Sequence, residues 1–333
     1  MTHDRPSLGI LLMLGFCITA PMGDAVAKLL GAHIPLGQML FVRFAAQVLL
    51  LAPLIWATGR IWRMQGRVLR LTFVRTLLHI AGIGAMFTGL KYLPLADAVA
   101  IAFVMPFIML LLGKYVLGEE VGMIRLLACI VGFGGTLLVI QPSFVTVGWH
   151  ALWPLMVAVI FALFMLVTRQ IAKDTDPVGL QAVSGTMACV LLAPVLLLGQ
   201  ITDSPVLTLI TPNAEQWGLL AAIGLLGTAA HLLMTWSLRY APAATLASMQ
   251  YLEIPVAALI GLWIFDELPN GLAAIGILIT IAAGLFVILR ERQIQLQKAA
   301  ADRAALLLKD PPIAPEQPAW SDRLGRLGQN KIA

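Results

Sequence analysis

The chain has 333 residues, of which 60% are hydrophobic and only 12% are charged, and its mean hydropathy is +0.91. This composition excludes a soluble globular domain and indicates an integral membrane protein. The formal net charge of +5 therefore indicates contact with an anionic membrane surface rather than with nucleic acid.

The transmembrane elements are predicted from apolar segments of about 20 residues, the length that crosses roughly 30 Å of hydrocarbon as a helix. In chain order these segments lie near residues 8–30, 36–58, 71–90, 94–116, 121–140, 149–168, 178–199, 216–238, 241–265 and 269–289. We therefore predict an all-α integral membrane protein with ten transmembrane helices.

One motif occurs twice and indicates an internal duplication. Lys91-Tyr92-Leu93-Pro94 returns as Arg239-Tyr240-Ala241-Pro242, at an offset of 239 − 91 = 148 residues. At the same offset Gly118-Glu119 corresponds to Asp266-Glu267. A constant offset is typical of a repeat. We predict two five-helix repeats, at 8–140 and 149–289, followed by a C-terminal tail at 291–333.

The basic residues predict the orientation of the repeats. Five crossings in each repeat place the two halves in opposite orientations, and cytoplasmic loops carry the excess of Lys and Arg. With a cytoplasmic N-terminus, that side holds Arg5, Arg60, Arg63, Arg67, Arg70, Arg169, Lys173, Arg239, Arg290 and Arg292. The connections at 141–148 and 200–215 hold no Lys or Arg. Both termini are therefore predicted to be cytoplasmic.

The tail changes in character after the last apolar segment. Residues 293–308 have the pattern of a short amphipathic helix on the cytoplasmic side. Prolines at 311, 312, 315 and 318 predict that the end of the chain is partly disordered.

Motifs for catalysis and metal binding are absent from the sequence. There is no Walker motif, no Gly-x-Ser-x-Gly elbow and no His-Glu-x-x-His, and the histidines lack ligand spacing. Cys17, Cys129 and Cys189 are far apart in apolar segments, which indicates packing rather than disulfide or metal chemistry. We predict no enzymatic activity, no catalytic residues, no metal, no cofactor and no ATPase partner.

Ionisable residues inside the spans are the candidates for function, because a charge near the bilayer centre costs about 2.5–3.5 kcal/mol on insertion scales. Asp24 and Arg43 fall at similar depths, roughly 9 and 10 Å below the outer surface at 1.5 Å per residue. They either form a neutralising ion pair or line a substrate path. Lys28, one turn from Asp24, either shares that carboxylate or extends to the lipid headgroups.

A deeper layer is predicted near the midplane, where Glu253 and His79 both fall at roughly 16–18 Å. Gln250 and Glu253, three residues apart, are expected on one helix face, and His231 is expected to complete the wall. Desolvation disfavours the charged carboxylate, so Glu253 is the candidate for coupling to protons. The alternative is a neutral acid hydrogen-bonded to a neighbour.

Other charged residues have an ordinary interpretation. Arg75, Lys114, Arg125 and Arg239 lie near predicted helix ends, from which their side chains are expected to extend to the interface.

The stretch from Leu90 to Glu120, with Lys91-Tyr92-Leu93-Pro94 leading through Pro106 to Leu117-Gly118-Glu119, resembles the drug/metabolite transporter superfamily in its form with two EamA domains. The likeness covers residues 8–290. The second copy departs from it at Asp266-Glu267, and carries Glu253 where the first has Met105. The resemblance implies alternating-access transport in the bacterial cytoplasmic membrane, through a cavity between inverted repeats.

Within the superfamily, the segment around Arg43 and Leu95-Ala96-Asp97-Ala98-Val99 are similar to a subgroup with riboflavin transporters and S-adenosylmethionine carriers. This likeness implies riboflavin uptake as the first hypothesis. Export of amino acids or related metabolites, and S-adenosylmethionine transport, stay open, as does proton coupling against facilitated diffusion. A zwitterion needs paired charges, which Asp24, Arg43 and Glu253 offer. The expected partners are a small-molecule substrate and the lipid bilayer, around a monomer or homodimer.

Overall fold

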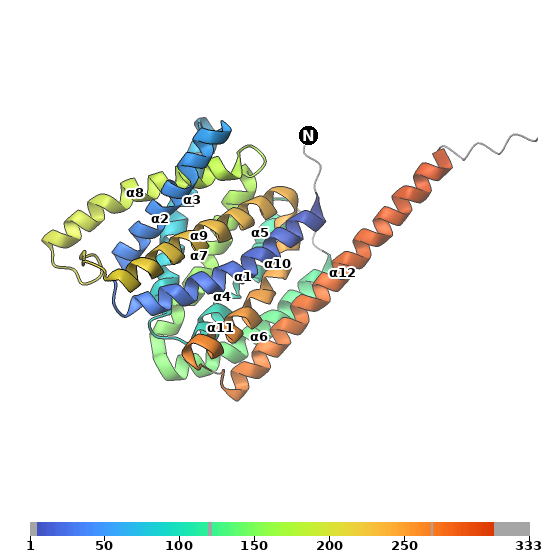
Figure 1. The fold of residues 1–333 in the computed structure, drawn as a ribbon. Coiled ribbons are helices and arrows are strands. Elements are labelled where there is room, and N and C mark those ends of the chain that lie inside the picture. Colours follow the sequence, from blue (N-terminus) through green and yellow to red (C-terminus); the bar gives the residue numbers. More distant parts are fainter. Residues whose placement is uncertain (1–4, 119–121, 268, 310–333) are drawn as a thin grey trace, which may run out of the picture. The chain divides into compact units, whose positions relative to one another are not determined.

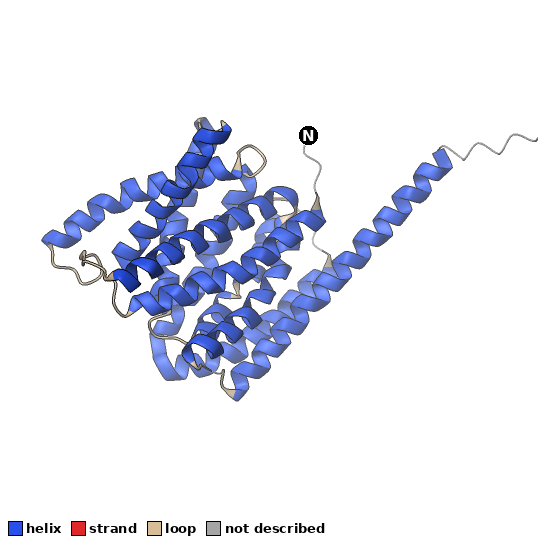
Figure 2. Cartoon of the chain, viewed as in Figure 1, coloured by secondary structure: helices blue, strands red, loops and turns tan. Residues whose placement is uncertain are grey.

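The computed structural model describes residues 5–118, 122–267 and 269–309, and within these ranges it contains helices and no strand (Figure 2). The chain divides into two compact units, Met1–Ile288 and Leu289–Ala333. Glu119 of the first repeated motif lies outside the described residues, as do the prolines at 311, 312, 315 and 318.

The helices are labelled in Figure 1. The first repeat contains α1 (Pro6–Gly31), α2 (Leu36–Thr58), α3 (Gly66–Gly89), α4 (Leu95–Ala102), α5 (Met105–Tyr115) and α6 (Met123–Val147). The second contains α7 (Leu152–Ile171), α8 (Pro177–Ile201), α9 (Ala214–Tyr240), α10 (Ala243–Met249), α11 (Glu253–Phe265) and the start of α12 (Gly271–Lys309). Two 3₁₀ turns, η1 (Gly148–Ala151) and η2 (Gln250–Leu252), precede α7 and α11.

Each predicted apolar segment falls on a helix or on a pair of short helices. Among the described residues, seven helical ranges are long and apolar enough to cross a membrane. One of them, Leu126–Ile171, includes both α6 and α7, and two shorter apolar ranges follow at Gln250–Phe265 and Gly271–Phe286. The all-helical membrane fold is confirmed, whereas the count of ten crossings stays a prediction.

The fourth predicted span consists of α4 and α5, and the ninth of α10, η2 and α11, so each has a break in its α-helical geometry near the middle. After the breaks, α5 begins at Met105 and α11 begins at Glu253, which are 253 − 105 = 148 positions apart. Pro106 and Pro255 lie in the first turn of each new helix. A proline removes the backbone N–H that a continuous helix needs and is tolerated at a helix start.

The helices of one repeat pack mainly against those of the other. Each such contact has a counterpart, in which each helix is replaced by the equivalent helix of the other repeat. α1 packs against α9, and the counterpart pair, α7 and α3, also packs together. Likewise α4 contacts α11 while α10 contacts α5, and α2 packs against its own counterpart α8 (Figure 1). This pattern of contacts is expected when an approximate two-fold axis relates the two repeats.

Small residues allow α6 and α12 to approach closely. A Cβ added at Gly135 would lie 2.5 Å from Thr280 Oγ1 and 2.7 Å from the carbonyl oxygen of Gly276. The Thr280 hydroxyl donates to the carbonyl oxygen of Gly276 at 2.7 Å. The close approach of α6 and α12 therefore depends on the absence of a side chain at Gly135.

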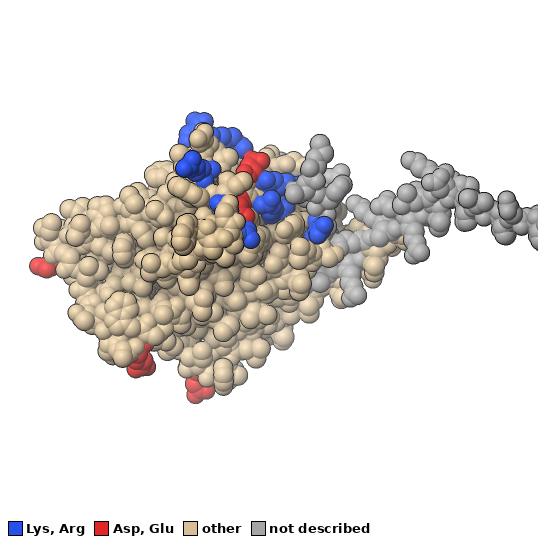
Figure 3. Space-filling model, turned by 45° about the horizontal axis from the view of Figure 1, so that its top comes forward, with Lys and Arg blue, Asp and Glu red and all other residues tan. Residues whose placement is uncertain are grey.

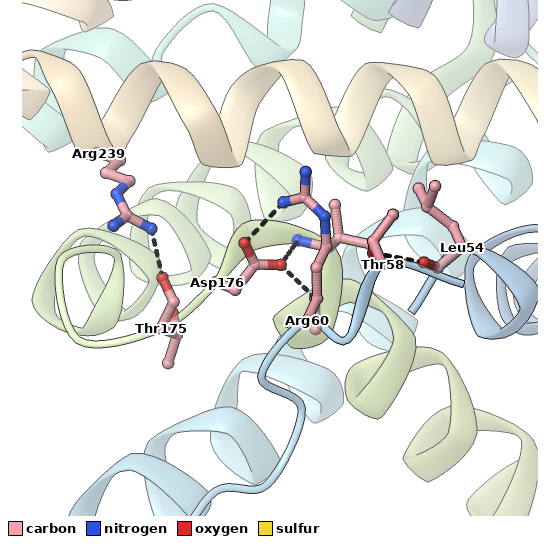
Figure 4. Close-up of polar contacts among 8 residues, drawn as sticks. Leu54, Thr58, Arg60, Thr175, Asp176 and Arg239 are labelled. Carbon is pink, nitrogen blue, oxygen red and sulfur yellow. Dashed lines mark hydrogen bonds and ion pairs between the residues drawn. The ribbon is translucent and has the colours of Figure 1, made fainter. Parts of the chain in front are cut away.

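The connection between α7 and α8 holds two arginines from other parts of the chain (Figure 4). The Asp176 carboxylate caps α8 by accepting from two backbone N–H groups of its first turn, both at 3.1 Å. It also pairs with Arg60 at 2.9 Å. The carbonyl oxygen of Thr175 accepts from Arg239 Nη1 at 2.7 Å. The connections beside α2, α8 and α9 are thereby fixed to one another.

The described part of the second unit, residues 289–309, is helical throughout. The helix predicted at 293–308 is confirmed, but it is the end of α12 rather than a separate helix.

Candidate substrate-binding site

A cavity lies in the first unit among α1, α2, α3, α9 and the start of α11, with α4, α5 and α7 completing its wall. Its volume is about 100 Å³. The wall is mostly apolar and includes the rings of Phe16, Phe87, Phe103 and Phe161. Its ionisable side chains are Asp24, Arg43, His231 and Glu253. A few charged groups among aromatic walls are typical of a site for a small organic molecule.

Arg43, on α2, brings a positive charge to this cavity. Its side chain is 4% exposed, and its Nη1 has no hydrogen-bond partner among the described residues. Gly227 on α9 leaves room for it, because a Cβ there would lie 2.6 Å from Arg43 Nε. A buried guanidinium with an unused donor is suited to bind an anionic group, since charge-assisted hydrogen bonds are the strong ones.

Asp24, on α1, lines the same cavity without pairing with Arg43. No ion pair within 4.0 Å joins the Asp24 carboxylate to the Arg43 guanidinium. Of the two interpretations of Asp24 and Arg43, the neutralising ion pair is therefore not formed in this conformation. The cavity presents a carboxyl group and a guanidinium separately.

Glu253 is the first residue of α11 and directly follows the 3₁₀ turn η2, so its carboxyl group lies where the helical geometry changes. The residue is 9% exposed and lines the cavity. Its counterpart Met105 begins α5 and also lines the cavity. Only the second repeat therefore places an acid at the helix break.

The two predicted histidines meet in the structure. The rings of His79 and His231 lie 4.1 Å apart, centroid to centroid. His231 lines the cavity, whereas His79 lies behind it, fully buried between Phe44 and Phe164. Neither His79 nitrogen has a hydrogen-bond partner among the described residues. The pair therefore extends inward from the cavity wall.

Gln250 lies away from the cavity wall. It begins η2 and is fully buried, and its Nε2 lies 3.6 Å from the sulfur of Met165 on α7. The break before α11 changes the helical spacing on which the shared face with Glu253 was expected. The structure therefore brings Asp24, Arg43, His231 and Glu253 together around the cavity, and leaves His79 and Gln250 behind its wall.

Arg75 departs most from the sequence prediction, because it does not reach the interface. Its side chain is fully buried and donates four hydrogen bonds, to Thr168, Ser184, Gln181 and Thr235. A signal was present in the sequence: Arg75 precedes His79 by four residues, and Gly82 follows at the next turn on the same face of α3.

Lys28 also has a partner different from both that were expected. Its Nζ lies 2.5 Å from Glu267 Oε1 and donates to the carbonyl oxygen of Leu93 at 3.0 Å. Glu267 further accepts from the backbone N–H of Leu95 at 3.1 Å. This ion pair joins α1 and the start of α4 to the segment after α11, so it connects the two repeats.

No group of three His, Cys, Asp or Glu side chains is placed to hold a metal ion within the described ranges. Cys17, Cys129 and Cys189 form no disulfide with one another. The cavity therefore offers binding by charge, hydrogen bonds and aromatic surface.

Comparison with known families matches the chain twice. The model of the EamA-like transporter family matches residues 7–141 and again residues 148–290. One solved crystal structure has a similar fold, with a TM-score of 0.65 and 18% sequence identity over 87% of this chain and 99% of that chain.

Characterised relatives are named as transporters. The S-adenosylmethionine uptake transporter of Rickettsia prowazekii is 24% identical over 86% of this chain and 94% of the relative. The riboflavin transporter of Rhizobium johnstonii is 28% identical over 65% and 69%. The pseudopaline exporter CntI of Pseudomonas aeruginosa is 25% identical over 85% and 96%.

Proposed function

Because the chain belongs to the EamA-like transporter family, we propose that it carries a small zwitterionic metabolite by alternating access. Its family and the names of its relatives make it a multi-pass transporter of small metabolites in the bacterial cytoplasmic membrane, and not an enzyme. In alternating access the cavity opens to one side of the membrane at a time. The driving force for net transport comes from the concentration gradients of the transported solutes.

The ten crossings and the opposite orientations of the repeats belong to this proposal. The exchange of contacts between the pairs α1–α9 and α7–α3 supports two repeats related by a two-fold axis. Lys and Arg side chains gather in one region of the face shown in Figure 3, as expected for a cytoplasmic end. Both termini then lie in the cytoplasm, and Asp24 and Arg43 lie in the outer half of the membrane.

The single observation that carries the substrate class is Arg43, a buried guanidinium at the cavity without an ion pair among the described residues. A carboxylate of the substrate would satisfy it by a bidentate contact. Asp24 and Glu253, on the same wall, would then receive a cationic group of the substrate. A zwitterion is therefore the substrate whose charges match the cavity.

Among zwitterions, S-adenosylmethionine fits best. Its carboxylate matches Arg43, its ammonium and sulfonium groups match the two carboxyl groups, and its adenine ring can stack on aromatic walls such as Phe161. Its name also appears in that of the Rickettsia prowazekii relative. The proposed substrate class is not limited to this molecule, since other amino-acid derivatives carry the same charges.

Riboflavin is the second candidate, and the phenylalanine rings of the cavity favour it. The flavin ring system is flat and neutral, so it would use Phe16, Phe87, Phe103 and Phe161 and would not require Arg43. The Rhizobium johnstonii relative is named a riboflavin transporter.

Glu253 is the proposed coupling residue, because it is the acid that lies both at the cavity and at a helix break. Protonation would remove its charge before the cavity closes, which lowers the cost of desolvation. His231 is proposed to contact substrate directly, and His79 and Gln250 to act from behind the wall. A monomer supplies every one of these groups.

The test is transport by the purified full-length chain in proteoliposomes, with labelled S-adenosylmethionine and labelled riboflavin in parallel. We expect saturable uptake of S-adenosylmethionine that excess riboflavin does not inhibit. Arg43→Gln should raise its half-saturation concentration about tenfold or more, since about 1.4 kcal/mol is one factor of ten. Saturable riboflavin uptake that is unchanged in Arg43→Gln would replace the zwitterion by the flavin. Saturable uptake of neither would contradict both.

A further inference from the structure

Beyond the cavity, α3 carries a second arginine that the proposed binding site does not use. Arg75 is fully buried, and its guanidinium lies 4.5 Å from the centre of the Phe164 ring. It joins the first half of α3 to the last turns of α7 and α9 and to the first turns of α8. In the proposed topology these are the cytoplasmic ends of four helices.

The partners of Arg75 are all neutral. Nε donates to Thr168 Oγ1 at 2.9 Å and Nη1 to Ser184 Oγ at 3.1 Å. Nη2 donates to Gln181 Oε1 at 3.2 Å and to Thr235 Oγ1 at 3.4 Å. No carboxylate pairs with it in the described part of the chain. A buried guanidinium gains less from neutral acceptors than from a carboxylate, so an incoming carboxylate can displace them.

A row of polar groups connects this cluster to the cavity. Arg75, His79 and Gly82 lie on one face of α3, and Gly82 lines the cavity. The His79 ring contacts that of His231, which also lines it. Both His79 nitrogens, Nδ1 of His231 and Nε2 of Gln181 are buried and without hydrogen-bond partners among the described residues.

Unsatisfied buried polar atoms are costly, and native structures keep few of them. Here they belong to residues that connect the cavity wall to Arg75, by the contact of His231 with His79 and by the hydrogen bond of Arg75 with Gln181. A polar ligand that enters this row would satisfy them. The row therefore offers a path for a polar ligand between the cavity and Arg75.

We propose that the guanidinium of Arg75 alone is a second anion site on this path, which takes the carboxylate of the substrate when the cavity opens toward the cytoplasm and the neutral acceptors Gln181, Ser184 and Thr235 release that guanidinium. The proposal rests on the transport of a zwitterion. Arg43 then holds the carboxylate in the outward-facing state and Arg75 holds it in the inward-facing state. Between these two states the neutral hydroxyl and amide groups accept the hydrogen bonds of the Arg75 guanidinium.

The test compares transport in right-side-out and inverted membrane vesicles, which present the outer and the cytoplasmic side to labelled S-adenosylmethionine. Arg75→Lys keeps the positive charge but loses the paired N–H donors of the guanidinium. We expect it to raise the half-saturation concentration about tenfold in inverted vesicles only. Arg43→Lys should raise it in right-side-out vesicles only. Arg239→Lys, which alters an arginine bound to a backbone carbonyl, is the matched control.

A purely structural link between helices predicts a different pattern. Loss of Thr235 or Ser184 would then act like loss of Arg75, lowering the melting temperature and changing both vesicle types alike. An anion site predicts that Thr235→Ala and Ser184→Ala leave the half-saturation concentration within about twofold, since neither touches the substrate charge. Equal effects of Arg75→Lys in both orientations, or none, would overturn the anion site while leaving the proposed function intact. Wild-type vesicles that carry riboflavin but no zwitterion would overturn both.

Discussion

Phe103 and Tyr251 lie one repeat apart in the sequence, 251 − 103 = 148, and their rings contact each other with centroids 5.5 Å apart. Two equivalent residues can meet only near the axis that relates them. Thr280 and Gly132, again 148 apart, make a second such contact, with 3.5 Å between the Thr280 hydroxyl and the Gly132 carbonyl oxygen. Phe103 also lines the cavity. The cavity therefore lies beside the pseudo-symmetry axis.

The contact of α6 with α12 leads to a stability prediction at Gly135. Gly135→Ala places a Cβ against Thr280 and a backbone carbonyl and should lower the free energy of unfolding by about 1–3 kcal/mol. Gly134→Ala is the matched control, because its Cβ would meet nothing within 4 Å. It should gain up to about 1 kcal/mol from helix propensity. Thermal unfolding in detergent measures both, and equal melting temperatures would contradict the close packing.

Gly227 leads to a prediction about binding without unfolding. A Cβ in Gly227→Ala would lie 2.6 Å from Arg43 Nε, the mobile end of a long side chain, so the guanidinium shifts while the fold is retained. We expect the half-saturation concentration for S-adenosylmethionine to rise by about fivefold or more, since a displaced charged hydrogen bond costs about 1–3 kcal/mol. The melting temperature should stay unchanged. Gly218→Ala, also in α9 with nothing within 4 Å, should transport like the wild type.

Glu253→Gln keeps the size of the side chain and removes its titratable carboxyl group. If Glu253 couples transport to protons, the variant should lose uptake driven by a pH gradient while exchanging labelled for unlabelled substrate at equal pH on both sides. Uptake by liposomes with an imposed pH gradient measures the first activity, and counterflow without a gradient measures the second. Glu215→Gln, in the exposed first turn of α9, is the control. Unchanged gradient-driven uptake in Glu253→Gln would assign coupling elsewhere.

The ion pair of Lys28 with Glu267 should stabilise the protein more than that of Arg60 with Asp176. The side chains of the first pair are 16% and 29% exposed and those of the second 39% and 21%, and exposed pairs contribute only about 0–1 kcal/mol. Double-mutant cycles with alanine, followed by thermal unfolding, measure each coupling energy. We expect about 1 kcal/mol or more for Lys28–Glu267 and less for Arg60–Asp176. Equal coupling would show that burial does not distinguish them.

The helices were predictable because hydropathy is a local property, and each apolar segment became a helix or a pair of helices. The duplication was predictable from the tyrosine-proline motif. The breaks before Met105 and Glu253 were not, because a proline near the start of a helix and one within a continuous kinked helix look alike in sequence.

The depth of the candidate site residues along their helices was predictable from the sequence, but their side-chain contacts were not. Depth along a helix follows from residue counting, so Asp24 and Arg43 were expected in one layer, and both line the cavity. The rotation of each helix depends on its distant neighbours. The partner of Lys28 lies 239 residues away and those of Arg75 lie 93 to 160 residues away, beyond any local pattern.

The difference between Met105 and Glu253 has an energetic consequence for the whole transport cycle. If the two repeats were identical in sequence, exchanging their conformations would convert the outward-facing state into an equivalent inward-facing one, and the two would be equally populated. An acid at one helix break and a thioether at the other removes that equivalence. Under the proposed mechanism we therefore expect the empty carrier to populate the two states unequally, and protonation of Glu253 to change the ratio of the two populations.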